Sequence, residues 1–339
     1  MMQGGSVVLE MFNLPYDAYL WQDWFGGDPQ KLEDMTADLG VDGLEIICGD
    51  ADAVEGFPRH LIRGCHLIFY ADWLDFWRGD TAALQQKFGP PEVWREFYRA
   101  DGPADMEAAF ARDLERAAAF GAQYVVFHVS DVSIEEVHTF RWQHSNEEII
   151  DAAVGLINRL LAGKDYQFDF LMENLPWPGL RFDDPALTAR LLDRVDYPHK
   201  GIMLDIGHLM TTNDRLTDEQ QAAAYITGCL DAHGDLCRYI KGVHLHTSLS
   251  GEYVRACRSN PPPLPRGDVY QRFAESYQHI LRIDEHKPCR TAALRPVLQR
   301  IAPKYIVHEL SAATPQAKSE AVLCQRRALG LDKRQKPTE

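Results

Sequence analysis

The chain lacks a paired arrangement of cysteines. Its seven cysteines are odd in number and scattered, and no Cys-x-x-Cys occurs. A disulfide framework needs pairs and a thiolate zinc site needs closely spaced ligands, so the pattern argues against both. It fits a reducing compartment, and we expect a cytoplasmic protein.

Long apolar runs and an excess of positive charge are also lacking. No run approaches the roughly 18 apolar residues that span a bilayer, and the N-terminal stretch has no basic segment ahead of a long apolar one. The formal net charge of −15 opposes binding to nucleic acid, because a polyanion surface is bound by clustered Lys and Arg. We expect no signal-peptide export, no membrane span and no nucleic-acid partner.

A glycine-rich phosphate turn does not follow the first expected strand. The residues there are Phe12-Asn-Leu-Pro, which do not fit Gly-x-Gly-x-x-Gly. This argues against a doubly wound nucleotide-binding sheet, which is the main structural alternative. In addition, the polar side chains gather on the later strands of the chain instead of at one switch point of a sheet.

Short apolar strands alternate with amphipathic helices along the whole chain. Strands are expected over residues 7–12, 43–47, 64–69, 124–128, 168–173, 201–205, 240–246 and 305–309, and helices over 29–39, 104–120, 146–161, 184–195, 218–233 and 268–281. The apolar runs at the expected strands are too short for helices. They are also too uniformly apolar for strands that expose one face to solvent. The sequence therefore predicts an α/β protein, a (β/α)8 TIM barrel. We expect a single TIM-barrel domain over residues 1–330 and a polar C-terminal tail over 331–339.

Two long loops follow the third and seventh strands, on the expected catalytic face. Residues 70–102 are rich in aromatics, and residues 248–266 contain a run of prolines. Loops of this length form lids or oligomer contacts, and a homo-oligomer stays open. We assign Trp73, Trp77 and Trp177 to a substrate lid that stacks on a sugar ring. In the alternative, the aromatics form a satellite core under the loop.

Ionisable side chains stand where the apolar strands end. They are His66, His128, Glu173, Asp205, His208, His244, His246 and Glu309. Buried charge is costly unless it is paired or bound to a metal. Because parallel strands of a barrel end on one face, these groups would converge into an oxygen and nitrogen cage for a divalent cation.

Each of these residues has a structural alternative. Glu173 could form a structural ion pair, although the prolines that follow it place it at the mouth of the barrel. Asp205 could cap a helix. His244 and His246 share a face of the seventh strand by strand alternation. In the last strand the same alternation points His308 outward, because its neighbour Glu309 points inward. A lone histidine at a strand end, such as His66 or His128, is often only a hydrogen-bonded core group.

These residues resemble the metal-binding pattern of the xylose isomerase-like TIM barrels, a superfamily of sugar isomerases and epimerases that also includes endonuclease IV. The resemblance rests on Glu173 with Asn174, Asp205 with Gly207 and His208, the Val-His-Leu stretch at His244, and Glu309. It implies one divalent ion held by Glu173, Asp205, His244 and Glu309, and catalytic roles for Glu173, Glu309 and His208. In endonuclease IV additional histidines support further zinc ions, and His66, His128 and His208 resemble several of them in position. We assign His66, His128 and His246 to a possible second metal or to the substrate.

The chain departs from the family pattern after the seventh strand. Thr247 stands where an acidic residue is frequent, and Ser250 stands where the keto-sugar epimerases have an arginine. No counterpart is expected for the Asp-x-His that completes the third zinc site of endonuclease IV. The substrate therefore cannot be inherited from the resemblance.

Three functions follow in order of preference. The first is a metal-dependent isomerase or epimerase acting on a sugar, sugar phosphate or cyclitol through an enediolate, with Mn²⁺, Mg²⁺, Co²⁺ or Zn²⁺ as the ion. The second is a multinuclear hydrolase or lyase in which Glu173 bridges two ions. The third is a non-catalytic sugar-binding protein. The metal content per chain would separate the first two.

Overall fold

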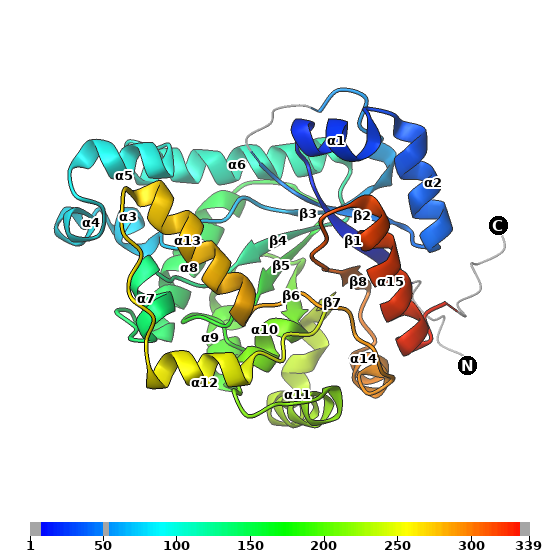
Figure 1. Ribbon diagram of the computed structural model, residues 1–339. Coiled ribbons are helices and arrows are strands. Elements are labelled where there is room, and N and C mark those ends of the chain that lie inside the picture. Colours follow the sequence, from blue (N-terminus) through cyan, green and yellow to red (C-terminus); the bar gives the residue numbers. More distant parts are fainter. Residues whose placement is uncertain (1–7, 50–53, 333–339) are drawn as a thin grey trace.

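The computed structural model describes residues 8–49 and 54–332, and within them eight parallel strands close into a barrel in chain order (Figure 1). The strands are β1 (Leu9–Pro15), β2 (Gly43–Ile47), β3 (Ile62–His66), β4 (Tyr124–His128), β5 (Asp169–Glu173), β6 (Lys200–Asp205), β7 (Ile240–Leu245) and β8 (Tyr305–His308). β8 pairs with β1 and completes the ring. The predicted TIM barrel is confirmed.

Helices surround the barrel and cover the ends of its strands. They are α1 (Ala18–Phe25), α2 (Pro29–Leu39), α3 (Leu74–Arg78), α4 (Thr81–Phe88), α5 (Pro91–Tyr98), α6 (Pro103–Phe120), α7 (Ile134–Thr139), α8 (Asn146–Leu161), α9 (Pro185–Arg194), α10 (Ile206–Thr211), α11 (Glu219–His233), α12 (Gly251–Ser259), α13 (Val269–Ile283), α14 (Arg295–Ile301) and α15 (Pro315–Leu329), with 3-10 turns at Arg59–Leu61 and Gly234–Tyr239. None of the described helices is long and apolar enough to cross a bilayer.

Local sequence signals fix many of the helix ends. Ser145 caps α8 in a capping box with Glu148, in which each side chain accepts a hydrogen bond from the other residue's backbone N–H. α2 begins at a proline behind the capping Asp28 and ends at Gly40, whose φ of 66° suits glycine. These signals explain why both helices begin and end at or near the predicted residues.

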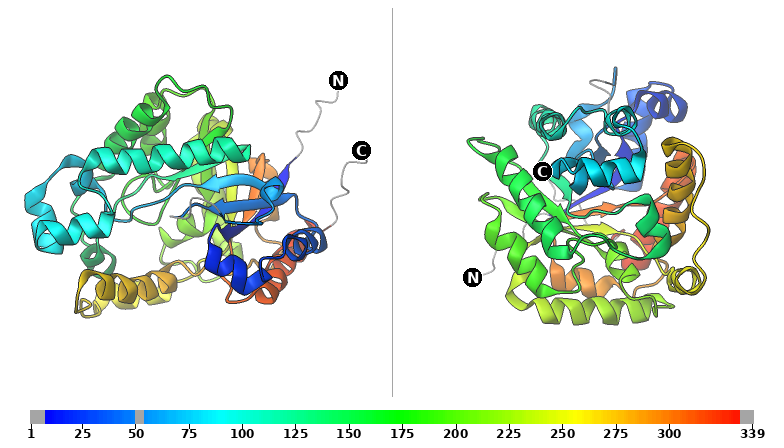
Figure 2. Two further views of the ribbon diagram at one scale, coloured as in Figure 1. Left: turned by 90° about the horizontal axis from the view of Figure 1, so that it is seen from above. Right: turned by 90° about the vertical axis from the view of Figure 1, so that its left-hand side faces the viewer.

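The segment after β3 differs from the prediction. Residues 70–102 carry no strand, as expected, but they hold the three short helices α3, α4 and α5. β3 itself starts at Ile62 and ends at His66, so residues 67–69 leave the sheet sooner than predicted. Figure 2 shows these three helices at the opposite end of the molecule from α2 and α15. The long loop after β7 likewise contains α12.

The barrel interior is layered. Met11, Val126, Leu171, Met203 and Val307 form an apolar plug inside the strands. Because side chains alternate along a strand, Glu173 lies two residues beyond Leu171 on the same face, and Asp205 stands in the same relation to Met203. The ionisable side chains therefore rest on an apolar floor, at the carboxyl ends of the strands.

A buried ion pair joins the barrel to the last helix. Arg326 of α15 donates from Nε to Glu10 Oε1 of β1 at 2.6 Å, and His308 Nε2 lies 2.8 Å from the same oxygen. His308 thus points outward from the barrel and is packed beneath α15, as alternation predicts. Of the predicted tail, residues 333–339 lie outside the described residues, and Leu331 is buried. The single-domain boundary at residue 330 stays a prediction.

We expect Arg326→Met to lower the free energy of unfolding by about 3–5 kcal/mol, because it leaves the buried Glu10 carboxylate without its guanidinium. Chemical denaturation would measure the change. Arg327→Met is the matched control, since Arg327 is exposed on the same helix, and it should change stability by less than about 0.5 kcal/mol. Equal effects of the two substitutions would contradict the role of the ion pair.

Candidate metal centre

Four buried ligand atoms meet at the end of β7. The side chains are Glu173, Asp205, His244 and Glu309, which we call the central group. His244 Nδ1 lies 3.0 Å from Glu173 Oε1, 2.8 Å from Glu309 Oε2 and 3.8 Å from Asp205 Oδ2. Ligands about 2.0–2.2 Å from one metal ion are separated by such distances. The four predicted ligands are therefore brought together in a geometry that fits one divalent cation.

Glu45 of β2 fixes the orientation of the central histidine. His244 Nε2 lies 3.0 Å from Glu45 Oε1, and both side chains are fully buried. With the Nε2 proton donated to this carboxylate, the Nδ1 lone pair faces the three other ligands. A carboxylate behind a ligating imidazole also raises its basicity. Glu45 is therefore a positioning residue of the central group.

A second group forms around the other oxygen of Glu173. His66 Nε2 and His128 Nε2 lie 2.9 Å apart, and each is 3.3 Å from Glu173 Oε2. His66 Nδ1 lies 2.9 Å from the carbonyl of Leu67 and is placed to donate to it, which leaves Nε2 as an acceptor. The three atoms can hold a second ion, with Glu173 between the two groups.

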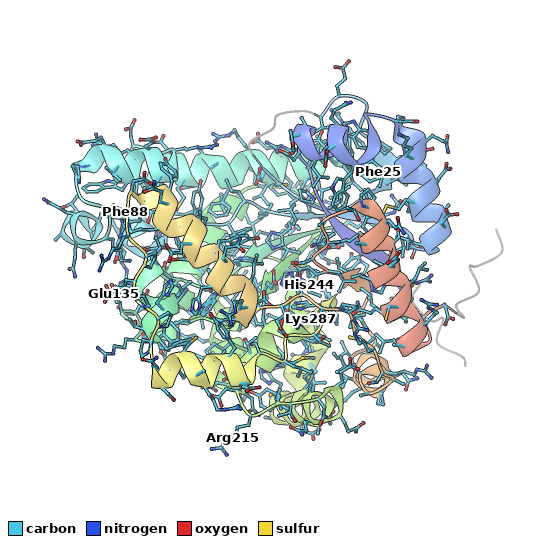
Figure 3. All side chains as sticks on the ribbon, in the orientation of Figure 1. Phe25, Phe88, Glu135, Arg215, His244 and Lys287 are labelled. Carbon is cyan, nitrogen blue, oxygen red and sulfur yellow. The ribbon has the colours of Figure 1, made fainter. Side chains whose placement is uncertain are left out.

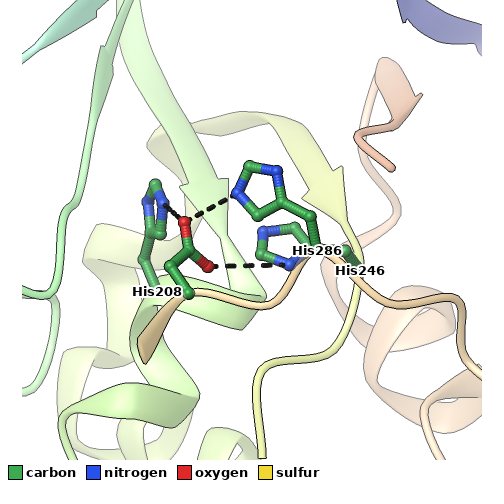
Figure 4. Close-up of side chains that lie close together, drawn as sticks. His208, His246 and His286 are labelled. Carbon is green, nitrogen blue, oxygen red and sulfur yellow. Dashed lines mark hydrogen bonds and ion pairs between the residues drawn. The ribbon is translucent and has the colours of Figure 1, made fainter. Parts of the chain in front are cut away.

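A third group lies behind Asp205 and contains His208, His246, Asp284 and His286. Asp284 Oδ2 lies 3.0 Å from His208 Nε2 and 2.7 Å from His286 Nε2, and Oδ1 lies 4.0 Å from His246 Nδ1 (Figure 4). The expectation that no Asp-x-His follows the seventh strand is wrong. Asp284-Glu-His286 supplies it at the end of α13, about 40 residues beyond β7 instead of directly after it.

Small and amide side chains hold these groups in place. Asn174 forms two hydrogen bonds of 2.9 Å with the backbone N–H and C=O of Asp205, and so locks the ends of β5 and β6 together. A Cβ at Gly207 would overlap the His246 imidazole. Asp205 also caps α10, since its Oδ1 accepts from the His208 N–H at 2.6 Å. The capping and ligand roles therefore use different oxygens of one carboxylate.

The buried carboxylates of the site are balanced by protonated imidazoles and could be balanced by a cation. Burial alone would raise the pKa of Glu173 and Glu309, but the neighbouring imidazoles hold both values well below their usual range. Burial would lower the pKa of His244, but Glu309, Glu45 and Glu173 raise it well above its usual value. Without metal, protons on the histidines balance the carboxylates. Glu309 Oε2 lacks an aligned hydrogen bond although it is buried, as expected of an atom aimed at an ion. The residues fit divalent metals.

The predicted lid tryptophans are placed mostly in the core. Trp73 is buried and donates its indole N–H to the Ser130 carbonyl at 2.7 Å. Trp177 is buried in an apolar cluster, and Trp77 is half-buried beneath Arg159. These positions favour the satellite-core alternative, and the lid role stays a prediction. The aromatic that borders the second group is Phe69, which is 48 % exposed with its ring centroid 4.7 Å from that of His128.

Sequence reasoning missed Glu45, Asp284 and His286. Glu45 stands inside the apolar run Gly43-Leu-Glu-Ile-Ile, and a glutamate in the middle of a buried strand is a usable signal. Asp284 and His286 follow a helix, so the search of strand ends passed over them. Their spacing was visible in the sequence.

We expect Glu45→Gln to weaken metal binding or turnover by about 10–100-fold, because the neutral amide no longer fixes the tautomer and basicity of His244. Metal titration of the purified variant would measure the change in affinity. Glu115→Gln removes an exposed carboxylate paired with Lys164 and serves as the control. An unchanged affinity in a folded Glu45→Gln protein would contradict the positioning role.

Metal binding should release protons at pH 7. Burial lowers the pKa of His286, but Asp284, Glu309 and Asp205 raise it to about 9 in the metal-free protein, and the pKa of His208 is also raised. These imidazoles are protonated at pH 7 and must become neutral to ligate. Affinity should therefore rise as pH increases from 7 through about 9.

Calorimetric titration with Zn²⁺ in two buffers of different ionisation enthalpy would detect the protons. Identical heats in both buffers would contradict this expectation. Conversely, the imidazolium–carboxylate attraction that stabilises the metal-free fold should be fully present below about pH 6.5, the unperturbed value for histidine. It should be lost as pH rises through about 9.

Comparison with known proteins gives a coherent result. Residues 34–276, more than half of the chain, match the family model described as xylose isomerase-like TIM barrel. No curated protein matches the chain. Among solved structures, a D-psicose 3-epimerase in the presence of D-fructose is similar at 13 % identity and a TM-score of 0.52, covering 95 % of this chain and 100 % of the other.

An L-ribulose 3-epimerase aligns at 14 % identity and a TM-score of 0.51, covering 95 % of this chain and 94 % of the other. Endonuclease IV from Thermus thermophilus aligns at 18 % identity and a TM-score of 0.49, covering 95 % and 99 %. At these identities the likeness to the two epimerases shows the fold. The match to the family model shows that the chain belongs to the xylose isomerase-like TIM barrel family.

Proposed function

We propose that the protein is a metal-dependent enzyme with a multinuclear centre, and that it hydrolyses a phosphate ester of a small molecule. The observation that carries the proposal is the position of Glu173. One of its carboxylate oxygens faces the central group and the other faces His66 and His128. A carboxylate placed in this way could serve one ion at each of its oxygens, whereas a mononuclear site does not need the second group.

The charge of the whole site supports more than one cation. The three groups contain the carboxylates Glu173, Asp205, Asp284 and Glu309, all of them buried. With neutral histidines, one divalent ion leaves half of this negative charge uncompensated in a low-dielectric interior. Two or three divalent ions would supply Lewis acidity and neutralise the charge that develops on a phosphoryl group during transfer.

The residues of the chain would position the centre and its substrate. Glu45 and Asn174 fix the orientation of ligands. Ser248 donates from its hydroxyl to Asp284 Oδ1 at 2.8 Å and so orients the third group. Phe69 borders the histidines of the second group and can stack on a ring or exclude water there.

The net charge favours a small substrate over a polynucleotide. A value of −15 repels a polyanion over most of the surface. A single phosphate ester carries far less charge, and the metal ions would attract it locally. The absence of a nucleic-acid partner therefore stays part of the proposal.

A second candidate function is epimerisation or isomerisation of a sugar, sugar phosphate or cyclitol at a single ion. It is favoured by the central group taken alone, which offers three carboxylates and one imidazole to the cation. Hard oxygen ligands of this kind suit Mn²⁺, Mg²⁺ or Co²⁺. Glu173 at the end of β5 and Glu309 directly after β8 would then exchange a proton with the substrate carbon, and the other histidines would bind hydroxyl groups.

Metal analysis with paired variants separates the two functions. For the hydrolase we expect two or three ions per chain, and the double variant Asp284→Ala/His286→Ala should lose one of them and its phosphatase activity on p-nitrophenyl phosphate. For the epimerase, one ion per chain is expected, it should survive the double variant, and D-fructose should be converted to D-psicose.

Glu173→Gln should abolish either activity, because it removes the carboxylate that would serve two ions in the hydrolase and the single ion in the epimerase. One ion per chain combined with no phosphatase activity would overturn the preferred function. Elemental analysis after dialysis provides the count, and circular dichroism provides the check on folding.

A further inference from the structure

A cavity of about 150 Å³ lies outside the metal centre, between the helices that follow β3 and those that follow β4 and β7. α4 and α5 form one wall, α7 a second and α13 a third. Phe88 and Glu135, which line the cavity, lie on the side of the molecule away from His244 (Figure 3). The cavity is therefore distinct from the ligand groups described above.

An apolar cluster separates the cavity from the metal centre. Val132 and Val137 line the cavity and pack in one cluster with Leu175 and Ile283. Leu175 directly follows Asn174, and Ile283 directly precedes Asp284, so the inner side of this cluster adjoins the metal ligands. A molecule in the cavity would be screened from the ions by these side chains.

The two basic side chains around the cavity differ in whether a carboxylate partner neutralises them. Lys87 lies 2.7 Å from both Asp72 and Asp75, so its ammonium group is already neutralised. Arg272 of α13 has no carboxylate partner among the described residues. Its Nη2 donates to the Lys87 carbonyl at 3.2 Å, while its Nε is buried and has no hydrogen-bond partner. A buried donor of a charged group without an acceptor is costly.

The chemistry of a fitting ligand follows from this environment. A cavity of the same volume engineered in another protein holds benzene, so there is room for a ring or a branched chain. Most of the rest of the wall is apolar, with Phe97 and Ile280 among its residues. Of the two carboxylates on it, Asp72 is paired with Lys87 and Glu135 is exposed. A guanidinium with a free Nε–H is suited to a carboxylate, which can accept from two of its nitrogens.

We propose that this cavity binds a small carboxylic acid with an aromatic or branched aliphatic body, its carboxylate on Arg272 and its apolar part between α4, α7 and α13. The proposal does not rest on the function of the metal centre. Because the apolar cluster screens the cavity from the metal ligands, a bound acid would act as an effector separate from the metal centre.

The probe is 4-fluorobenzoate, followed by ¹⁹F NMR with the full-length protein. We expect saturable binding that 4-fluorobenzyl alcohol, its neutral counterpart, does not match. Arg272→Gln should weaken the binding by about tenfold or more, because it removes a charge-assisted hydrogen bond. Arg282→Gln, which removes an exposed arginine of the same helix, should leave it unchanged. Ala83→Trp, which fills the cavity from α4, should abolish it.

A carboxylate could also bind the metal ions, so the titration is repeated after chelation with EDTA. Binding that persists supports the cavity, and binding that disappears places the probe on the metal centre and overturns the proposal. No binding at millimolar probe, or equal binding to the parent and both cavity variants, would overturn it too. If Ala83→Trp fails to fold, the comparison of Arg272→Gln with Arg282→Gln still decides.

Discussion

The buried carboxylate of Glu173 sets the main constraint on this protein. It is 1 % exposed and stands at the end of a strand inside the barrel, where an uncompensated charge would be strongly destabilising. His244 faces one of its oxygens, and His66 and His128 face the other. Compensation by protonated imidazoles and compensation by metal ions compete for the same space. In the metal-free protein the imidazoles compensate the charge as protonated groups, and the same side chains are those that could hold a metal.

The barrel makes this concentration of ionisable groups possible. β3 to β8 deliver their terminal side chains to one face, and the closed sheet has no edge at which water could enter between strands. Beneath them, the plug of Met11, Leu171 and Met203 keeps the lower barrel dry. Side chains more than 200 residues apart in sequence, such as His66 and Glu309, are held near one carboxylate with little freedom to separate. Such preorganisation is what a multinuclear site requires.

The sequence predicted the parts of the structure that follow from periodicity. Eight apolar runs predicted the strands. The ionisable residues near their ends predicted the central group of Glu173, Asp205, His244 and Glu309, because all strands of a parallel barrel end on the same face. Glu45 was missed because it lies inside a strand and not at its end. The direction of its side chain into the barrel became known only from the register of β2 with β1 and β3. Asp284 and His286 were missed because they follow a helix. Their approach to His208 depends on how α13 crosses the barrel mouth, which no local pattern encodes.

The aromatic insertion was the least predictable segment, since its rings could equally face a substrate or a core. Its position is decided by Asp131, three residues beyond His128 in the loop after β4. The Asp131 carboxylate accepts from the backbone N–H groups of Trp73 and Leu74 at 2.7 and 2.9 Å, and so tethers the start of α3. Lys87 then joins α4 to Asp72 and Asp75. The loop that follows β4 thereby also fixes the start of the aromatic insertion, whose helix α4 lines the cavity.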